Sequence, residues 1–61
     1  MKFNEEIKHF RKKLGLTQIE LGNTLKTSHR TIQEWERGVI EPPNYAKELL
    51  IKELRNMIKE K

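Results

Sequence analysis

Glycine and proline constrain this chain more than any other residues, because their positions divide it into four segments. Gly15 and Gly38 each follow a stretch with helical spacing of apolar residues, and glycine commonly follows the last turn of a helix. Pro42 and Pro43 interrupt helix formation again before the last segment. No stretch shows the alternation of apolar and polar residues that is typical of a strand, so the sequence predicts an all-α fold.

The first three segments have the boundaries expected of short helices. We predict a first helix over about residues 4–14, and a second helix that begins after Thr17. Thr17 and Glu20 have the spacing of a capping box, in which each side chain accepts a hydrogen bond from the backbone of the other residue. Ser28 is placed to cap a third helix over about residues 28–37.

The fourth segment is expected to form one helix from Tyr45 to about residue 59, capped by Asn44. Ile51 is predicted to lie off the inward face of this helix. The residues predicted to face inward are Ala46, Leu49, Leu50, Leu54, Met57 and Ile58. The last three of these are also a candidate seam between two copies of the chain.

The size and charge of the chain limit its functions. Its 61 residues are enough for a single domain, over residues 1–61, with a thin core. The 13 Lys and Arg residues outnumber the 9 acidic residues, and the net charge of +4 favours polyanionic partners such as nucleic acid. The chain has no Cys, and His9 and His29 have no partners at metal-ligand spacing. We therefore expect no metal, cofactor, small-molecule ligand or enzymatic activity.

The sequence gives no indication of membrane insertion or secretion. No apolar run approaches the roughly 20 residues of a membrane span, and the first residues lack the apolar region of a secretory signal. We expect a cytoplasmic protein without membrane contact.

Residues 17–38 have the organisation of two short helices joined by a tight turn. Such a unit needs a small residue where the helices cross, and Gly22 occupies that position although glycine inside a helix costs about 1 kcal/mol relative to alanine. The unit also needs apolar side chains directed inward from both helices. The residues expected in this role are Ile19, Leu21, Leu25, Ile32 and Trp35.

This stretch resembles the Cro/repressor (Xre-type) helix-turn-helix family over about residues 7–50, with some features of antitoxin-type members. The motifs that carry the resemblance are LGLTQIEL at 14–21, TSHRTI at 27–32, WERG at 35–38, and Pro42. The resemblance implies a lambda-repressor-like bundle of four short helices, with five as the alternative, in a bacterial or phage protein. It also implies that the second helix of the motif lies in the major groove of DNA.

The resemblance assigns DNA contacts to two sets of residues. The expected base-contacting residues are Ser28, His29, Arg30, Gln33 and Glu34. In this set Arg30 can bond to guanine through two hydrogen bonds, and Gln33 can bond to adenine in the same way. The expected phosphate-binding residues flank this set: Thr17, Gln18, Lys26, Thr27 and Arg37.

Two further positions concern the frame that holds the motif. In many relatives an Arg of the first helix pairs with a Glu of the recognition helix, and Arg11 and Glu36 match these positions. Lys26 occupies the turn position at which relatives often have glycine. This departure predicts either a mildly strained left-handed lysine or a turn of different construction.

The sequence therefore predicts a double-stranded DNA-binding transcriptional regulator of the repressor type, which acts as a homodimer on a palindromic operator. The alternative is a protein-interaction module such as an antitoxin. Its main partner would be a protein such as a toxin, docked on the helix between Tyr45 and Lys61, and its DNA binding would be autoregulatory or lost.

Overall fold

The structure is a computed structural model that describes residues 2–59. Its helices are α1 (Phe3–Leu14), α2 (Gln18–Leu25), α3 (His29–Arg37) and α4 (Asn44–Lys59). Residues 2–59 contain no strand, so the predicted all-α class with four helices is confirmed. Residue 1 and residues 60–61, at the two ends of the predicted domain, lie outside the described residues.

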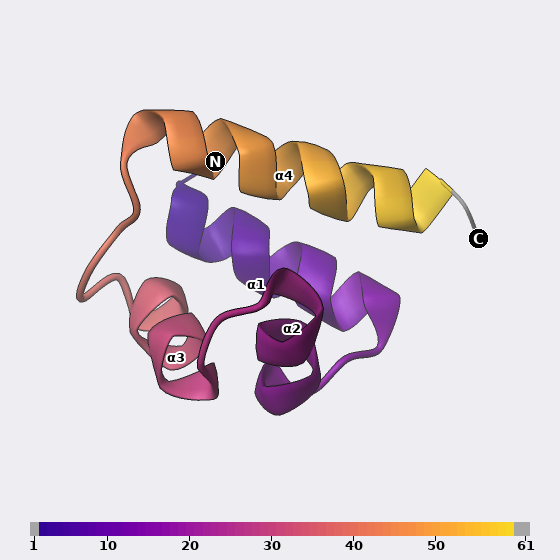
Figure 1. Ribbon diagram of the computed structural model, residues 1–61, viewed down its shortest axis with the longest axis horizontal. Helices are drawn as coiled ribbons and strands as arrows, with labels where there is room; N and C mark the ends of the chain where they lie inside the picture. The colour runs from indigo at the N-terminus through magenta and orange to yellow at the C-terminus, as the bar shows by residue number, and fades with distance from the viewer. Residues whose placement is uncertain (1, 60–61) are drawn as a thin grey trace.

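Helix α1 lies between the other helices. Helix α4 packs along one side of α1, and the pair of α2 and α3 lies on the other side (Figure 1). The first turns of α2 and α3 both lie at the edge of the molecule away from α4 (Figure 1). The motif is thus held mainly by α1, and α4 has at most a few contacts with it.

The core contains buried apolar residues from all four helices. These residues are Phe3, Ile7, Leu14, Leu21, Ile32, Ile51 and Leu54. Trp35 is half-buried and packs against this core, in agreement with its predicted inward position. Its ring meets the ring of Phe3 edge-on, with 5.9 Å between the centroids, which joins the start of α1 to α3.

Local sequence determines where α2 and α3 begin. The Thr17 hydroxyl accepts a hydrogen bond from the backbone N–H of Glu20 at 3.1 Å, and the Glu20 carboxylate accepts one from the Thr17 N–H at 2.8 Å. The predicted capping box is therefore confirmed. The Ser28 hydroxyl accepts from the N–H of Thr31 at 3.2 Å and caps α3 as predicted.

The predicted start and inward face of α4 are partly wrong. Asn44 is the first helical residue and not the cap, since the Lys47 N–H donates to the carbonyl of Pro43. Ile51 is buried, whereas Leu49 is 64% exposed, so the inward face is turned relative to the prediction. Because α4 packs mainly on α1, one side of the helix is covered, whereas Tyr45 and Leu49 on another side are left exposed.

The candidate seam at the end of α4 is wrong for Leu54. Leu54 is fully buried, and Met57 and Ile58 pack against the core. Leu54 therefore has no surface left for a second copy, whereas Met57 and Ile58 keep part of their surface exposed and their role in a seam stays a prediction. None of the helices within residues 2–59 has the length and apolar character needed to cross a membrane.

The predicted inward position of Ile19 is also wrong. It was expected to face inward with the rest of the motif, but it is 58% exposed in the first turn of α2. Leu21 is fully buried and Leu25 packs partly against the core, so α2 turns these two residues inward instead.

Candidate nucleic-acid interface

The two helices of the motif approach most closely at Gly22. A Cβ atom at this position would lie 2.7 Å from the carbonyl oxygen of Thr27 and 3.2 Å from the backbone nitrogen of His29. Both are backbone atoms, one in the segment that joins α2 to α3 and the other in the first residue of α3. The Thr27 N–H also donates to the Gly22 carbonyl at 2.8 Å. The predicted requirement for a small residue at this position is therefore confirmed.

The turn between the helices contains a left-handed lysine. Lys26 has φ 59° and ψ 42°, and within residues 2–59 it is the one residue other than glycine with a positive φ. Its N–H donates to the carbonyl of Asn23 at 3.3 Å, and its side chain is exposed. The turn thus keeps the conformation that favours glycine and places a cation beside the start of α3.

We expect Lys26→Gly to raise the free energy of unfolding by up to about 1 kcal/mol, because glycine adopts the left-handed conformation without a Cβ clash. Urea denaturation measures this change. Lys26→Ala is the matched control, since it removes the same charge but keeps the Cβ, and it should change stability by less than about 0.5 kcal/mol. A loss of stability in the glycine variant would contradict the prediction.

A buried carboxylate ties the motif to α1. The Glu36 side chain is only 2% exposed, and it accepts hydrogen bonds from Arg11 Nε at 2.6 Å and Arg11 Nη2 at 3.1 Å. The ion pair implied by the resemblance is thus present in the structure. Gln18 Nε2 donates to the same carboxylate at 3.2 Å, and Arg11 Nη1 donates to the carbonyl of Leu16 at 3.0 Å. One carboxylate therefore joins α1, α2 and α3.

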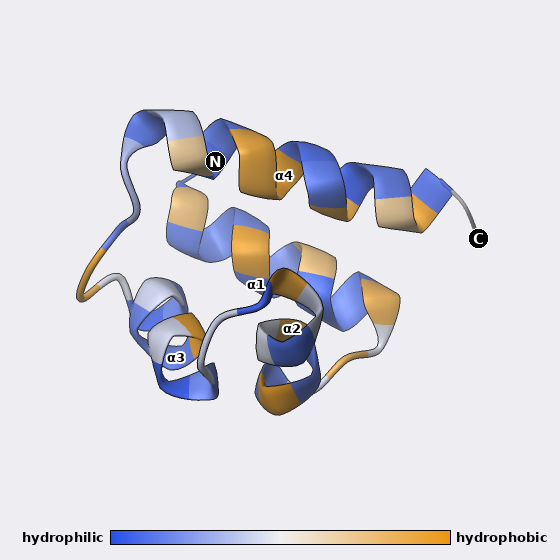
Figure 2. Ribbon diagram, viewed as in Figure 1, coloured by the Kyte–Doolittle hydropathy of each residue, from blue (hydrophilic) through white to orange (hydrophobic). Residues whose placement is uncertain are grey.

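Helix α3 has an inner face that is packed and an outer face that is polar. Ile32 is fully buried and Glu36 is bound to Arg11, so these residues fix the helix against the body. The expected base-contacting residues lie on the opposite face. Ser28, His29, Arg30 and Gln33 are exposed, while Glu34 is half-buried. In Figure 2 this helix is drawn largely in the hydrophilic colours.

The expected phosphate-binding residues surround this outer face. Thr17, Lys26 and Arg37 are exposed, and Gln18 and Thr27 are partly buried. The capping box uses the N–H groups of Thr17 and Glu20, so the N–H groups of Gln18 and Ile19 remain at the exposed first turn of α2. The side-chain amide of Gln18 is bonded to Glu36, whereas its backbone N–H lies at the positive end of the helix dipole.

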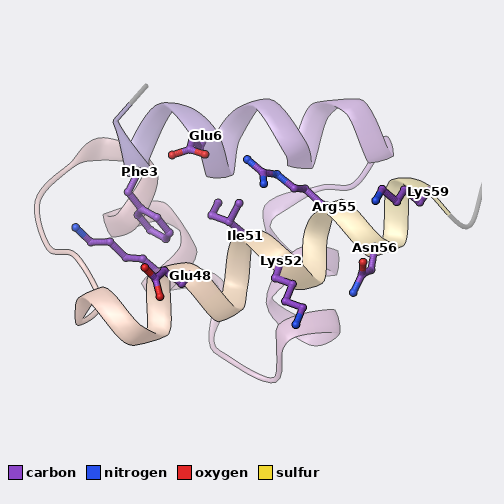
Figure 3. A pocket seen from close by; sticks show the side chains of 9 residues that line it. Phe3, Glu6, Glu48, Ile51, Lys52, Arg55, Asn56 and Lys59 are labelled. Carbon is purple, nitrogen blue, oxygen red and sulfur yellow. The ribbon is translucent and has the colours of Figure 1, made fainter.

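A concave feature that does not involve α3 lies between α1 and α4. It is a groove of about 680 Å³, and Figure 3 shows charged side chains around it, among them Glu6, Glu48 and Arg55. Its apolar members, Phe3 and Ile51, are nearly buried and leave little apolar surface for a ligand. Within residues 2–59, no group of three or more His, Cys, Asp or Glu residues has an arrangement able to hold a metal ion.

The fold and this site define a helix-turn-helix protein, in which a short helix, a left-handed turn and a second helix cross at a glycine. The helix-turn-helix family model matches residues 7–44, which is more than half of the chain. The chain therefore belongs to the Xre-type helix-turn-helix family. The match ends at the first residue of α4, so the rest of that helix lies outside it.

One curated relative supports this assignment. The HTH-type transcriptional regulator DicA of Escherichia coli (strain K12) is 47% identical to this chain over 38 residues. These residues cover 62% of this chain but only 28% of DicA, so the similarity concerns one part of a longer protein. No solved structure has a significant match to the chain.

Proposed function

We propose that this chain binds double-stranded DNA in a sequence-specific manner and acts as a transcriptional regulator of the repressor type. The observation that carries the proposal is the division of α3, whose inner face is fixed by Ile32 and Glu36 and whose outer face offers exposed polar side chains. A helix with its side chains is about 10–12 Å wide, which fits the major groove of about 12 Å. The name of DicA as a transcriptional regulator supports the same function.

In the proposed complex the two sets of residues have different tasks. Arg30 and Gln33 form paired hydrogen bonds with the edges of guanine and adenine, and His29 at the start of α3 contacts a neighbouring base. The backbone at the start of α2 binds phosphate, and Lys26 and Arg37 bind phosphates beside α3. Ser28 contributes less to base contacts, because its hydroxyl already caps α3.

Two copies are proposed to bind one palindromic operator. A single domain of this size offers few phosphate contacts, and binding by one copy would be weak. Two recognition helices placed about one turn of DNA apart, roughly 34 Å, double these contacts and make the preferred site palindromic. The proposed location of the regulator is the cytoplasm, where chromosomal DNA is accessible.

Selection of bound sequences from random duplex DNA, at two salt concentrations, tests the proposed function. We expect enrichment of a palindromic motif at both concentrations. Enrichment without any sequence motif, together with a steep loss of binding at higher salt, would show only the general attraction of a basic protein to DNA and would contradict the proposal.

Arg30→Ala is expected to weaken binding to the selected site by about 1–3 kcal/mol and to leave binding to random DNA nearly unchanged. The reason is that a paired hydrogen bond to guanine distinguishes bases, whereas a phosphate contact does not. Fluorescence anisotropy with both duplexes measures the two affinities.

Arg37→Ala is the matched control, since the side chain is also an exposed arginine of α3. It should weaken binding to both duplexes equally. It should also reduce the slope of the logarithm of the binding constant against the logarithm of the salt concentration by about one. An equal loss on both duplexes for Arg30→Ala would remove this residue from the base-contacting set.

A further inference from the structure

The outer face of α4 carries an apolar pair that nothing in the described chain covers. Tyr45 is 72% exposed and Leu49 is 64% exposed, although both are large apolar side chains on the same helix. They are four residues apart and therefore lie next to each other on one face of α4. Ile51 and Leu54 face the core from the opposite side. Single exposed apolar residues are common on protein surfaces, whereas two adjacent ones form a contiguous apolar patch, and such patches are the kind of surface through which proteins associate.

We propose that this face binds the same face of a second copy of the chain, with the two α4 helices antiparallel about a two-fold axis close to Leu49. In such a pair each copy offers the same surface, so the face must be complementary to itself. The two Leu49 side chains lie against each other at the axis. Each Tyr45 ring lies over the part of the partner helix that follows Leu49, where the outer face is polar.

The charges beside this apolar pair favour the antiparallel arrangement. Glu48 and Lys52 lie on the same flank of the pair, before and after Leu49 along the helix. When α4 is reversed about Leu49, Glu48 of one copy comes beside the partner's Lys52, and the same contact forms a second time by symmetry. Within residues 2–59 neither side chain has an ion pair, so both are available to a partner. Both side chains also border the groove between α1 and α4 (Figure 3).

The size of the surface indicates weak association. A standard interface buries about 800 Å² on each partner, and one tyrosine and one leucine supply only part of this area. The pairing should therefore depend on protein concentration, and it should become significant where several copies are held close together.

The position of α4 gives this pairing a particular consequence, which rests on the proposed DNA binding. Helix α4 lies on the side of α1 opposite to α2 and α3 (Figure 1). Two copies joined through α4 would therefore direct their recognition helices away from each other. This contact differs from any contact between two copies on one operator, and it would connect two separate DNA segments.

Sedimentation velocity of the full chain without DNA tests the pairing itself. We expect a reversible dimer, and we expect Leu49→Ser to raise its dissociation constant by at least about tenfold, because two leucines leave each interface. Ile19→Ser is the matched control, since Ile19 is a similarly exposed apolar residue on α2, and it should leave the dimer unchanged. A monomer at all concentrations, or equal effects of both variants, would overturn the proposal.

Charge reversal tests the predicted register. Glu48→Lys alone and Lys52→Glu alone should each weaken the dimer by about three- to tenfold, because like charges then meet across the axis. A mixture of the two variants should associate as well as the unmodified chain, since opposite charges meet again at both contacts. An effect on the separate folding of each variant cannot produce this recovery. Failure of the mixture to associate would exclude the antiparallel arrangement.

A bridging experiment tests the consequence for DNA. An immobilised duplex is incubated with the protein and with a second, labelled duplex, and retention of the label is measured. Leu49→Ser should bind the immobilised duplex normally but retain at least about tenfold less label. Equal retention by both proteins would overturn the bridging role. Absence of binding to the first duplex would contradict the proposed function, while the sedimentation result would still decide whether α4 pairs.

Discussion

Replacing Arg11 by Met is expected to lower the free energy of unfolding by about 3–5 kcal/mol, the cost of leaving a buried carboxylate without its cation. Glu36 would keep only the hydrogen bond from Gln18, and its side chain has almost no access to water. A domain of this size has a total stability of roughly 3–9 kcal/mol, at about 0.05–0.15 kcal/mol per residue. The variant should therefore be largely unfolded near physiological temperature. Thermal denaturation followed by circular dichroism measures the effect.

The double variant Arg11→Met with Glu36→Leu is the informative control. It removes both charges and places apolar groups in the same space, so it should be clearly more stable than the single variant. If the single variant unfolds at the same temperature as the unmodified protein, the ion pair does not stabilise the fold. If the double variant is less stable than the single variant, the loss comes from packing and not from the unpaired carboxylate.

Gly22→Ala is expected to lower the free energy of unfolding by about 1–3 kcal/mol, although alanine favours helix by about 1 kcal/mol over glycine. The added Cβ would lie 2.7 Å from the Thr27 carbonyl oxygen. This oxygen belongs to the backbone, so it cannot rotate away as the end of a side chain can. The segment between the helices must shift, and α3 shifts with it. Urea denaturation measures the stability, and we expect specific DNA binding to weaken as well.

Asn23→Ala is the control for this substitution. Asn23 is the next residue of α2, its side chain is exposed, and the same gain in helix propensity should leave stability equal or slightly higher. If Gly22→Ala were as stable as Asn23→Ala, the close approach of the two helices would not limit the residue at position 22.

The features that were predicted correctly from the sequence depend on short spacings. The capping box of Thr17 and Glu20 needs two residue types three positions apart, and the backbone then makes both hydrogen bonds. The crossing at Gly22 follows from an unfavourable residue in an otherwise regular helix. These features are local, so they do not depend on how the helices are arranged.

The features that were predicted wrongly depend on the arrangement of helices in space. Apolar residues occur around much of α4, and its packing in the bundle, mainly on α1, decides that Ile51 turns inward and Leu49 outward. Ile19 has a suitable spacing for the inner face of α2, yet the first turn of that helix lies at the surface. The hydrogen bond from Gln18 to Glu36 joins residues 18 positions apart, and no local pattern in one sequence indicates it.

The division of α3 into two faces separates folding from recognition. Ile32 and Glu36 are held by the body of the protein, whereas Arg30 and Gln33 have no contact that the fold requires. Substitutions at such exposed positions usually change stability by no more than about 0.5 kcal/mol. Under the proposed function, new target sequences are therefore accessible through a few changes on one side of a single helix, and natural variants or engineered libraries can explore them without loss of the scaffold.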